Sequence, residues 1–183
     1  MGQSSLSLYK GSASRLIDSA VAHKEHYEIS IPQLAYIMAT SEHETAHTHE
    51  PVEEANWMSE TWRRNNLHYY PWHGRGFVQI TWEENYQRAQ DKLGIGTYLT
   101  DDPDRAMEPS ISAEICVCGM CEGWFTGKKL SDYINDGKTD YTEARRIVNG
   151  TDCAEQIAAI AVEYEKLIVA VGGYEAYKRK LNP

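Results

Sequence analysis

The sequence predicts a mainly α-helical fold with at most a minor β element. Apolar residues recur at spacings of three and four along several segments, and a helix-capping residue precedes most of these segments. Only one short segment alternates between apolar and polar residues. The chain has 183 residues, of which 42% are hydrophobic and 25% are charged, as is usual for globular proteins. We therefore expect residues 1–183 to form a single domain that buries its own hydrophobic core.

Two helices are expected within the first 50 residues. Ser4 or Ser5 can cap a helix that runs to about Tyr27. Ser30 followed by Pro32 is a good cap and first-turn pair for the next helix, which ends before position 51. The buried face of this second helix is expected to carry Leu34, Ile37, Met38 and Ser41.

The rest of the chain continues the helical pattern after a polar, aromatic stretch at residues 57–73. Helices are expected at residues 83–93, 110–125 and 140–148, with Ser110 and Asp140 as caps of the last two. A long apolar-faced helix from Thr151 should break at Gly172-Gly173, and a short basic helix follows. Residues 77–81 alternate and should form a short strand after a Gly-Arg-Gly turn, whereas residues 100–109 should form a loop.

The charge and the hydropathy pattern exclude several classes of partner. The net charge is −9, which argues against nucleic acid, because phosphate binding needs a basic surface. No apolar run approaches the roughly 18 residues of a membrane span. Residues 1–21 lack the apolar core of a signal peptide, and Leu6 occupies the position where a myristoylation site has Ser or Thr. Synthesis in a reducing cytoplasm is therefore expected.

The four cysteines are Cys116, Cys118, Cys121 and Cys153. Cys118 and Cys121 form a C-x-x-C pattern, which can belong to a redox or a zinc site. The segment around them, however, has the composition of a buried helix, and no second C-x-x-C follows. We therefore favour packed thiols, which behave as small hydrophobic side chains.

His43-Glu44-Thr45-Ala46-His47 matches the H-E-x-x-H pattern of zinc peptidases. On a continuous helix the two imidazoles would lie one turn apart, with a Glu beside them to polarise a zinc-bound water. A catalytic zinc needs a third protein ligand. His49, Glu53 and Glu54 are possible third ligands, but no spacing selects one of them.

The same Glu44 also fits a pair of carboxylates. Glu53 follows nine residues later, and glycosidic cleavage needs one carboxylic acid to protonate the leaving oxygen and one carboxylate to activate water or attack the sugar. Aromatic and amide side chains, which suit sugar rings and hydroxyl groups, follow in the same part of the chain. They include Asn56, Trp57, Trp62, Tyr69, Tyr70, Trp72, Gln79, Trp82, Asn85 and Tyr86.

Three motifs resemble glycoside hydrolase family 19, and they occur in the order in which that family has them. They are His43-Glu44-Thr45, the block from Gly74-Arg75-Gly76 to Asn85-Tyr86, and Arg145-Arg146-Ile147-Val148-Asn149-Gly150. The compact form is similar to the phage and prophage endolysins of that family, which cut bacterial peptidoglycan. The resemblance implies a lysozyme-like, two-lobed catalytic domain without a separate wall-binding domain.

The resemblance also implies roles for individual residues. Glu44 matches the general acid and Glu53 the second carboxylate, with Glu54 as the alternative, while Thr81 would help to hold the nucleophilic water. From their charge, and not from the resemblance, Arg145 and Arg146 are expected to brace carboxylates. Substrate contacts are expected from Asn56, Trp57, Gln79, Asn85, Tyr86 and Asn149.

The sequence thus predicts an inverting muramidase that cleaves the β-1,4 bond between N-acetylmuramic acid and N-acetylglucosamine in peptidoglycan. A zinc peptidase, a chitinase and a non-catalytic wall-binding protein are the alternatives. For this muramidase we expect no metal and no cofactor. We expect it to be a monomer and to bind peptidoglycan glycan strands. The enzyme would reach the periplasm and the cell wall from the host cytoplasm, for example through a holin. The basic tail Lys178-Arg179-Lys180 could contact the anionic envelope or simply suit the end of a helix.

Overall fold

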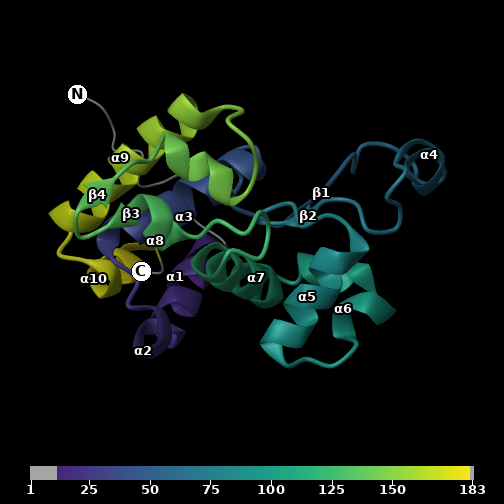
Figure 1. Cartoon of the computed structure of the whole chain (residues 1–183), viewed down its shortest axis with the longest axis horizontal. Coiled ribbons are helices and arrows are strands. Elements are labelled where there is room, and N and C mark those ends of the chain that lie inside the picture. Colours follow the sequence, from purple (N-terminus) through teal and green to yellow (C-terminus); the bar gives the residue numbers. More distant parts are fainter. Residues whose placement is uncertain (1–11, 182–183) are drawn as a thin grey trace.

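The computed structural model describes residues 12–181 and is mainly α-helical, as the sequence predicted (Figure 1). The longer helices are α1 (Ala13–Ala22), α3 (Ile31–Glu44), α5 (Glu83–Leu93), α7 (Pro109–Glu122), α9 (Ala154–Ala170) and α10 (Tyr174–Leu181). Short helices are α2 (Lys24–Tyr27), α4 (Glu60–Asn66), α6 (Tyr98–Asp101), α8 (Leu130–Tyr133) and the 3₁₀ helices η2 (Pro103–Met107) and η3 (Glu143–Ile147). Within the described residues, no helix is long and apolar enough to cross a membrane.

Two small antiparallel sheets complete the secondary structure. Strand β1 (Val52–Glu53) pairs with β2 (Arg75–Gly76), and β3 (Ile134–Asn135) pairs with β4 (Lys138–Thr139). In Figure 1, β1 and β2 lie between one group of helices that contains α3 and α9 and another that contains α5 and α6. Helix α7 packs against both α1 and η2. The fold is therefore mainly α and lysozyme-like, with the β1–β2 sheet between the two groups of helices and β3–β4 beside α8.

The core is built around α3, which packs along α9. Ser30 starts α3 with a capping box, because its hydroxyl accepts from the Gln33 backbone N–H while the Gln33 side chain accepts from the Ser30 N–H. Leu34, Ile37 and Met38 are completely buried, as the sequence predicted. This packing fixes the end of α3, where Glu44 lies.

Several boundaries differ from the predictions. The first helix breaks at His23 into α1 and α2, and the suggested caps Ser4 and Ser5 lie outside the described residues. Helix α7 begins at Pro109 and is not capped by Ser110, because the preceding Glu108 takes the N-cap position. Residues 100–109 contain part of α6 and η2. The segment 140–148 contains the 3₁₀ helix η3 (Glu143–Ile147) instead of an α-helix, and the sequence did not predict α4.

The prediction of a strand at residues 77–81 is wrong. The ladder forms directly before this segment, at Arg75 and Gly76, and within the segment only Ile80 pairs, in an isolated bridge to Arg75. The Phe77 N–H donates to the hydroxyl of Ser112 in α7 at 2.7 Å instead of to a strand. The apolar side chains of this segment are buried in a turn, so their alternation reflects packing against a helix and not a sheet.

Candidate active site

A cleft of about 520 Å³ lies where the end of α3, the β1–β2 sheet and the loop after α7 meet. Two carboxylates, Glu44 and Glu54, face this cleft together with amide, hydroxyl and aromatic groups. The other lining residues are Tyr69, Gly74, Val78, Gln79, Ile80, Thr81, Trp82, Asn85, Phe125, Val148 and Asn149. Such a mixture of polar and aromatic side chains around paired carboxylates is what hydrolysis of a sugar polymer requires.

Glu44 is held by a buried arginine. Glu44 is the last residue of α3. The chain turns away directly after Glu44, because Ala46 and His47 have positive φ angles of 50° and 66°. Arg145 Nη1 donates to Glu44 Oε1 at 2.6 Å, and Arg145 Nε donates to the carbonyl of Asp152 at 3.0 Å. The expected bracing by Arg145 is confirmed, and it orients the Glu44 carboxyl group at the cleft wall.

Glu54 is held by two neutral donors. The hydroxyl of Tyr69 donates to Glu54 Oε1 at 2.7 Å, and the backbone N–H of Gly74 donates to Oε2 at 2.8 Å. Burial, followed by the hydrogen bond to Glu54, raises the pKa of Tyr69 to about 12, so this phenol remains a donor at neutral pH. These two uncharged donors thus fix the Glu54 carboxylate in the cleft.

The structure places Glu53 away from the cleft lining. Successive side chains of a strand point to opposite faces, so Glu53 and Glu54 diverge where β1 ends. Glu53 Oε1 lies 2.9 Å from Nε2 of the buried His73, and Oε2 lies 3.4 Å from Arg63 Nη2. The carboxylate that the cleft brings together with Glu44 is therefore the alternative, Glu54, and not Glu53.

Gln79, Thr81 and Asn85 hold each other in the loop that lines the cleft. Gln79 Nε2 donates to the carbonyl of Val52 at 2.6 Å, which ties this loop to β1. Thr81 Oγ1 donates to the carbonyl of Gln79 at 2.9 Å, and Asn85 Nδ2 donates to the carbonyl of Thr81 at 2.8 Å. The Thr81 hydroxyl donates its proton to the carbonyl of Gln79, so its oxygen can accept a hydrogen bond from a ligand or a water.

Gly74 is required for this arrangement. A Cβ at this position would lie 2.7 Å from Gln79 Oε1 and 3.3 Å from Glu54 Oε2. Both contacts are tighter than ordinary van der Waals distances, so a larger residue would displace the cleft amide and press on the carboxylate.

Three of the six expected substrate contacts do not line the cleft. Tyr86 is completely buried, and its hydroxyl donates to the carbonyl of His73 while it accepts from Arg75 Nη1. Tyr86 is therefore a core residue, because a buried ring cannot reach a sugar. Asn56 and Trp57 lie on the exposed segment after β1, with Trp57 77% exposed. Gln79, Asn85 and Asn149 do line the cleft.

The sequence did not assign Tyr69, Trp82 or Phe125 to the site. The rings of Tyr69 and Trp82 lie 5.1 Å apart, and Trp82 is 47% exposed, so they offer an aromatic wall to a sugar ring. Tyr69 and Trp82 belong to the aromatic cluster seen in the sequence, but only the fold shows which members of this cluster face the cleft. Gly119 leaves room for the ring of Phe125, since a Cβ there would lie 2.4 Å from it.

The H-E-x-x-H pattern does not form the zinc-binding arrangement of a helix. Because α3 ends at Glu44, His43 and His47 are not one turn apart on a continuous helix. His47 Nδ1 instead pairs with Glu42 Oε1 at 2.8 Å, and the completely buried His49 contacts the hydroxyl of Tyr164 at 2.8 Å. These histidines thus belong to a local polar network beside the cleft.

A mainly α, lysozyme-like fold and a cleft with two carboxylates are features of enzymes that cleave glycans. No protein-family model matches the chain. Over 83 residues the chain is 32% identical to an endochitinase from Arabidopsis thaliana, and the matched part is 45% of this chain and 26% of the relative. The chain therefore spans about a quarter of the length of this curated relative. The similarity supports a relationship to a glycoside hydrolase family, without singling out phage endolysins.

Proposed function

We propose that this protein is a glycoside hydrolase that cleaves the β-1,4 bond between N-acetylmuramic acid and N-acetylglucosamine in bacterial peptidoglycan. The observation that carries the proposal is the presence of Glu44 and Glu54 on one cleft that is also lined by amides and aromatic rings. The motif resemblance to endolysins supports peptidoglycan as the substrate, and the similarity to a plant endochitinase supports glycosidic cleavage.

In the proposed mechanism Glu44 donates a proton to the leaving glycosidic oxygen. Glu54 takes a proton from a water, which attacks the anomeric carbon from the opposite side and inverts its configuration. Thr81 helps to hold this water through its acceptor capacity, and Tyr69 with the Gly74 N–H keeps the Glu54 carboxylate in place. The sequence resemblance favoured Glu53 for the second role, whereas the cleft geometry favours Glu54.

The substrate would bind as an extended glycan strand across the cleft. Trp82 and Tyr69 would stack against sugar faces, while Gln79, Asn85 and Asn149 would contact hydroxyl and acetamido groups. In this proposal the protein acts as a monomer at the cell wall after release from the host cytoplasm through a holin.

Mass spectrometry of digested peptidoglycan tests the function. A muramidase produces new reducing ends on N-acetylmuramic acid, and a glucosaminidase produces them on N-acetylglucosamine. Freed amino groups without reducing ends would show a peptidase and would overturn the proposal. The Glu44→Gln variant keeps the shape of the side chain but lacks the acid proton, so its rate should fall by about 10²–10⁴-fold.

Chitin cleavage is the second candidate, because the similar Arabidopsis protein is an endochitinase. The same enzyme preparation can be given chitin oligosaccharides and purified peptidoglycan at equal sugar concentration. A higher rate on chitin, with the same loss in Glu44→Gln, would keep the glycosidase mechanism but replace the proposed substrate.

A further inference from the structure

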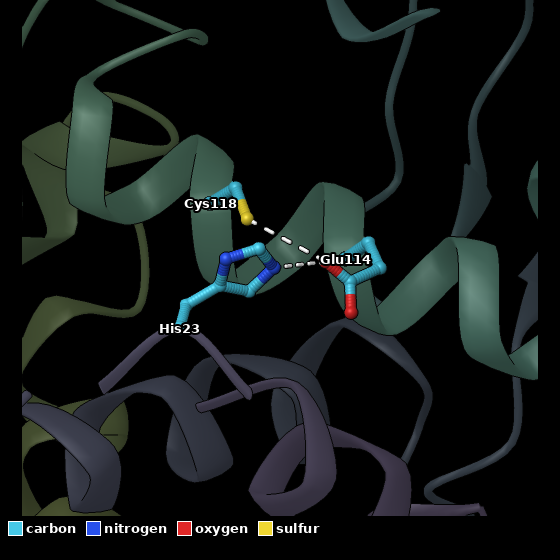
Figure 2. Close-up of side chains that lie close together, drawn as sticks. All are labelled: His23, Glu114 and Cys118. Carbon is cyan, nitrogen blue, oxygen red and sulfur yellow. Dashed lines mark hydrogen bonds and ion pairs between the residues drawn. The ribbon is translucent and has the colours of Figure 1, made fainter. Parts of the chain in front are cut away.

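A second cluster of chemically versatile side chains lies outside the cleft, where the end of α1 meets α7. His23, Glu114 and Cys118 place a ring nitrogen, a carboxylate oxygen and a sulfur within 4.8 Å of one another. His23 Nε2 lies 2.5 Å from Glu114 Oε2, and Cys118 Sγ lies 3.7 Å from the same oxygen. Figure 2 shows the imidazole near Glu114 and Cys118. Among the described residues, no other group of three such side chains is this close.

The backbone fixes all three side chains. Glu114 and Cys118 are four residues apart on α7 and therefore lie one turn apart on the same face. His23 is the C-cap of α1, and its backbone N–H donates to the carbonyl of Ser19 at 3.1 Å. Because α1 packs against α7, the position of the imidazole relative to the two α7 side chains is set by the fold.

A cavity of about 280 Å³ adjoins the cluster and gives it access to solvent. The side chains of His23 and Glu114 are 32% and 29% exposed, whereas Cys118 is buried. Lys92 also lines this cavity, but its ammonium lies 2.9 Å from Glu122 Oε2, which offsets the positive charge. The cavity has room for a water beside the three side chains.

The donor set matches a borderline-soft divalent cation. Imidazole nitrogen, thiolate sulfur and carboxylate oxygen are the three ligand types that zinc takes from proteins. With bond lengths of about 2.0–2.3 Å, a tetrahedral ion separates its ligands by roughly 3.3–3.8 Å. The sulfur–oxygen distance already falls in this range, and the close nitrogen–oxygen pair must open by about 1 Å. A thiolate and a carboxylate together would neutralise the double positive charge of the ion.

We propose that His23, Glu114 and Cys118 form a zinc site in which a water from the adjoining cavity is the fourth ligand. The ion would join the end of α1 to the middle of α7. None of the three ligands lines the catalytic cleft, so the ion would stabilise the fold and would take no part in glycosidic cleavage. This assignment is independent of the proposed glycosidase function.

The thiol must lose its proton when the ion binds. In the metal-free protein, burial and then the negative charge of Glu114 raise the pKa of Cys118 to about 12, so the side chain is a thiol at neutral pH. Binding would form the zinc–sulfur bond and release this proton to the solvent.

Titration of the chelator-treated full chain with Co²⁺ and Zn²⁺ tests the site. Co²⁺ should give the near-ultraviolet charge-transfer band of a cobalt–thiolate bond and the visible bands of a tetrahedral ion, and Zn²⁺ should remove both. Zinc at about 100 times its Kd should raise the Tm by roughly 5–10 °C. Glycan hydrolysis, assayed well below the Tm, should be equal with and without chelator.

Matched variants separate the site from other thiols and histidines. Cys118→Ala should abolish the charge-transfer band, whereas Cys153→Ala, which alters an exposed thiol, should retain it. His23→Gln should weaken zinc binding about 10-fold or more, and His26→Gln, on the exposed neighbour, should not. Glu114→Gln can still hydrogen-bond to His23, so it should fold normally but lose most of the zinc-induced shift in Tm.

Three results would overturn the proposal. One is the absence of a cobalt–thiolate band in the folded wild-type protein. Another is an equal shift in Tm in the wild type and Glu114→Gln. The third is a band that depends on Cys121 or Cys153 instead of Cys118. Any of them would mean that the three side chains are simply hydrogen-bonded to one another.

Discussion

Two adjacent glutamates acquire opposite environments in this fold. Glu53 faces the imidazole of His73 and the guanidinium groups of Arg63 and Arg75, at distances of 2.9, 3.4 and 3.9 Å. Glu54 faces a phenol and a backbone N–H at the cleft. A carboxylate that activates water must reach the substrate, which favours Glu54. The sequence resemblance selected Glu53, but motif spacing does not show which of two adjacent side chains faces the cleft, because this depends on how the end of β1 packs.

The first prediction compares these two residues. Glu54→Gln should reduce the rate of peptidoglycan hydrolysis by about 10²–10⁴-fold, because it removes the proposed general base. Glu53→Gln should retain most activity but lower the free energy of unfolding by about 1–3 kcal/mol, because it weakens the pairing of buried His73 and Arg75. Initial rates and urea unfolding of both variants measure the two effects. A strong rate loss in Glu53→Gln alone would assign the base to Glu53.

The second prediction concerns Glu42, which lies two residues before Glu44. Burial would raise the pKa of Glu42, but hydrogen bonds with His49, Tyr164 and His47 outweigh it and lower the pKa from 4.5 to about 2. A lowered pKa means that ionised Glu42 stabilises the fold fully above pH 4.5 and loses this contribution as the pH falls towards 2.

Unfolding of Glu42→Gln and the wild type across this pH range measures the effect. The difference in unfolding free energy should be largest above pH 4.5 and should shrink between pH 4.5 and pH 2. Glu163→Gln, which alters an exposed partner of Lys166, should show little difference at any pH. A constant difference for Glu42→Gln would show that its carboxylate is not specifically stabilised.

At the scale of elements, local signals predicted the helices that carry the core. The Ser30-Ile31-Pro32-Gln33 start and the apolar spacing gave α3, and residues 83–93 matched α5 at both ends. The failures arise where tertiary contacts decide the backbone. Phe77 donates its N–H to Ser112 of α7, a contact 35 positions away, and this contact replaces the expected strand. Two-residue strands such as β1 and β2 have no periodicity of their own.

The third prediction uses two serines that cap different helices. Ser30 accepts from the Gln33 N–H at the start of the buried helix α3, and Ser59 accepts from the Trp62 N–H at the start of α4, which has no buried residues. Ser30→Ala should lower the free energy of global unfolding by about 1 kcal/mol. Ser59→Ala should change it much less, since an exposed short helix can fray locally. Similar losses in urea unfolding of both variants would mean that α4 unfolds together with the core.

At the scale of the whole molecule, the cleft depends on segments that are distant in the chain. Glu44, Glu54, the loop at residues 74–85, Phe125 and Asn149 come from five parts of the sequence and meet at the cleft. The motif resemblance to glycoside hydrolase family 19 predicted Glu44, Gln79, Thr81, Asn85 and Asn149 as members of one site. It could not place Tyr86 in the core or Tyr69 and Trp82 on the cleft, because burial of an aromatic ring is set by how the lobes pack.

The surface beyond the cleft includes the basic C-terminal helix. Helix α10 packs against α1 and α9, its Tyr177 is completely buried, and Arg179 is exposed. We propose that the basic residues of this helix draw an otherwise acidic protein to the anionic bacterial envelope. Deleting the helix would remove the core residue Tyr177, so charge removal is the cleaner test.

The last prediction therefore replaces Lys178, Arg179 and Lys180 together by Gln. This triple variant should hydrolyse purified peptidoglycan at the wild-type rate but kill intact cells several-fold less efficiently, and added salt should narrow the difference because it screens surface charge. The matched control replaces Lys128 and Lys129, which are exposed and precede α8, by Gln, so it removes charge from another segment. Equal losses in both assays, or an equal loss in the control, would show that these cations support folding or solubility and do not guide the protein to the envelope.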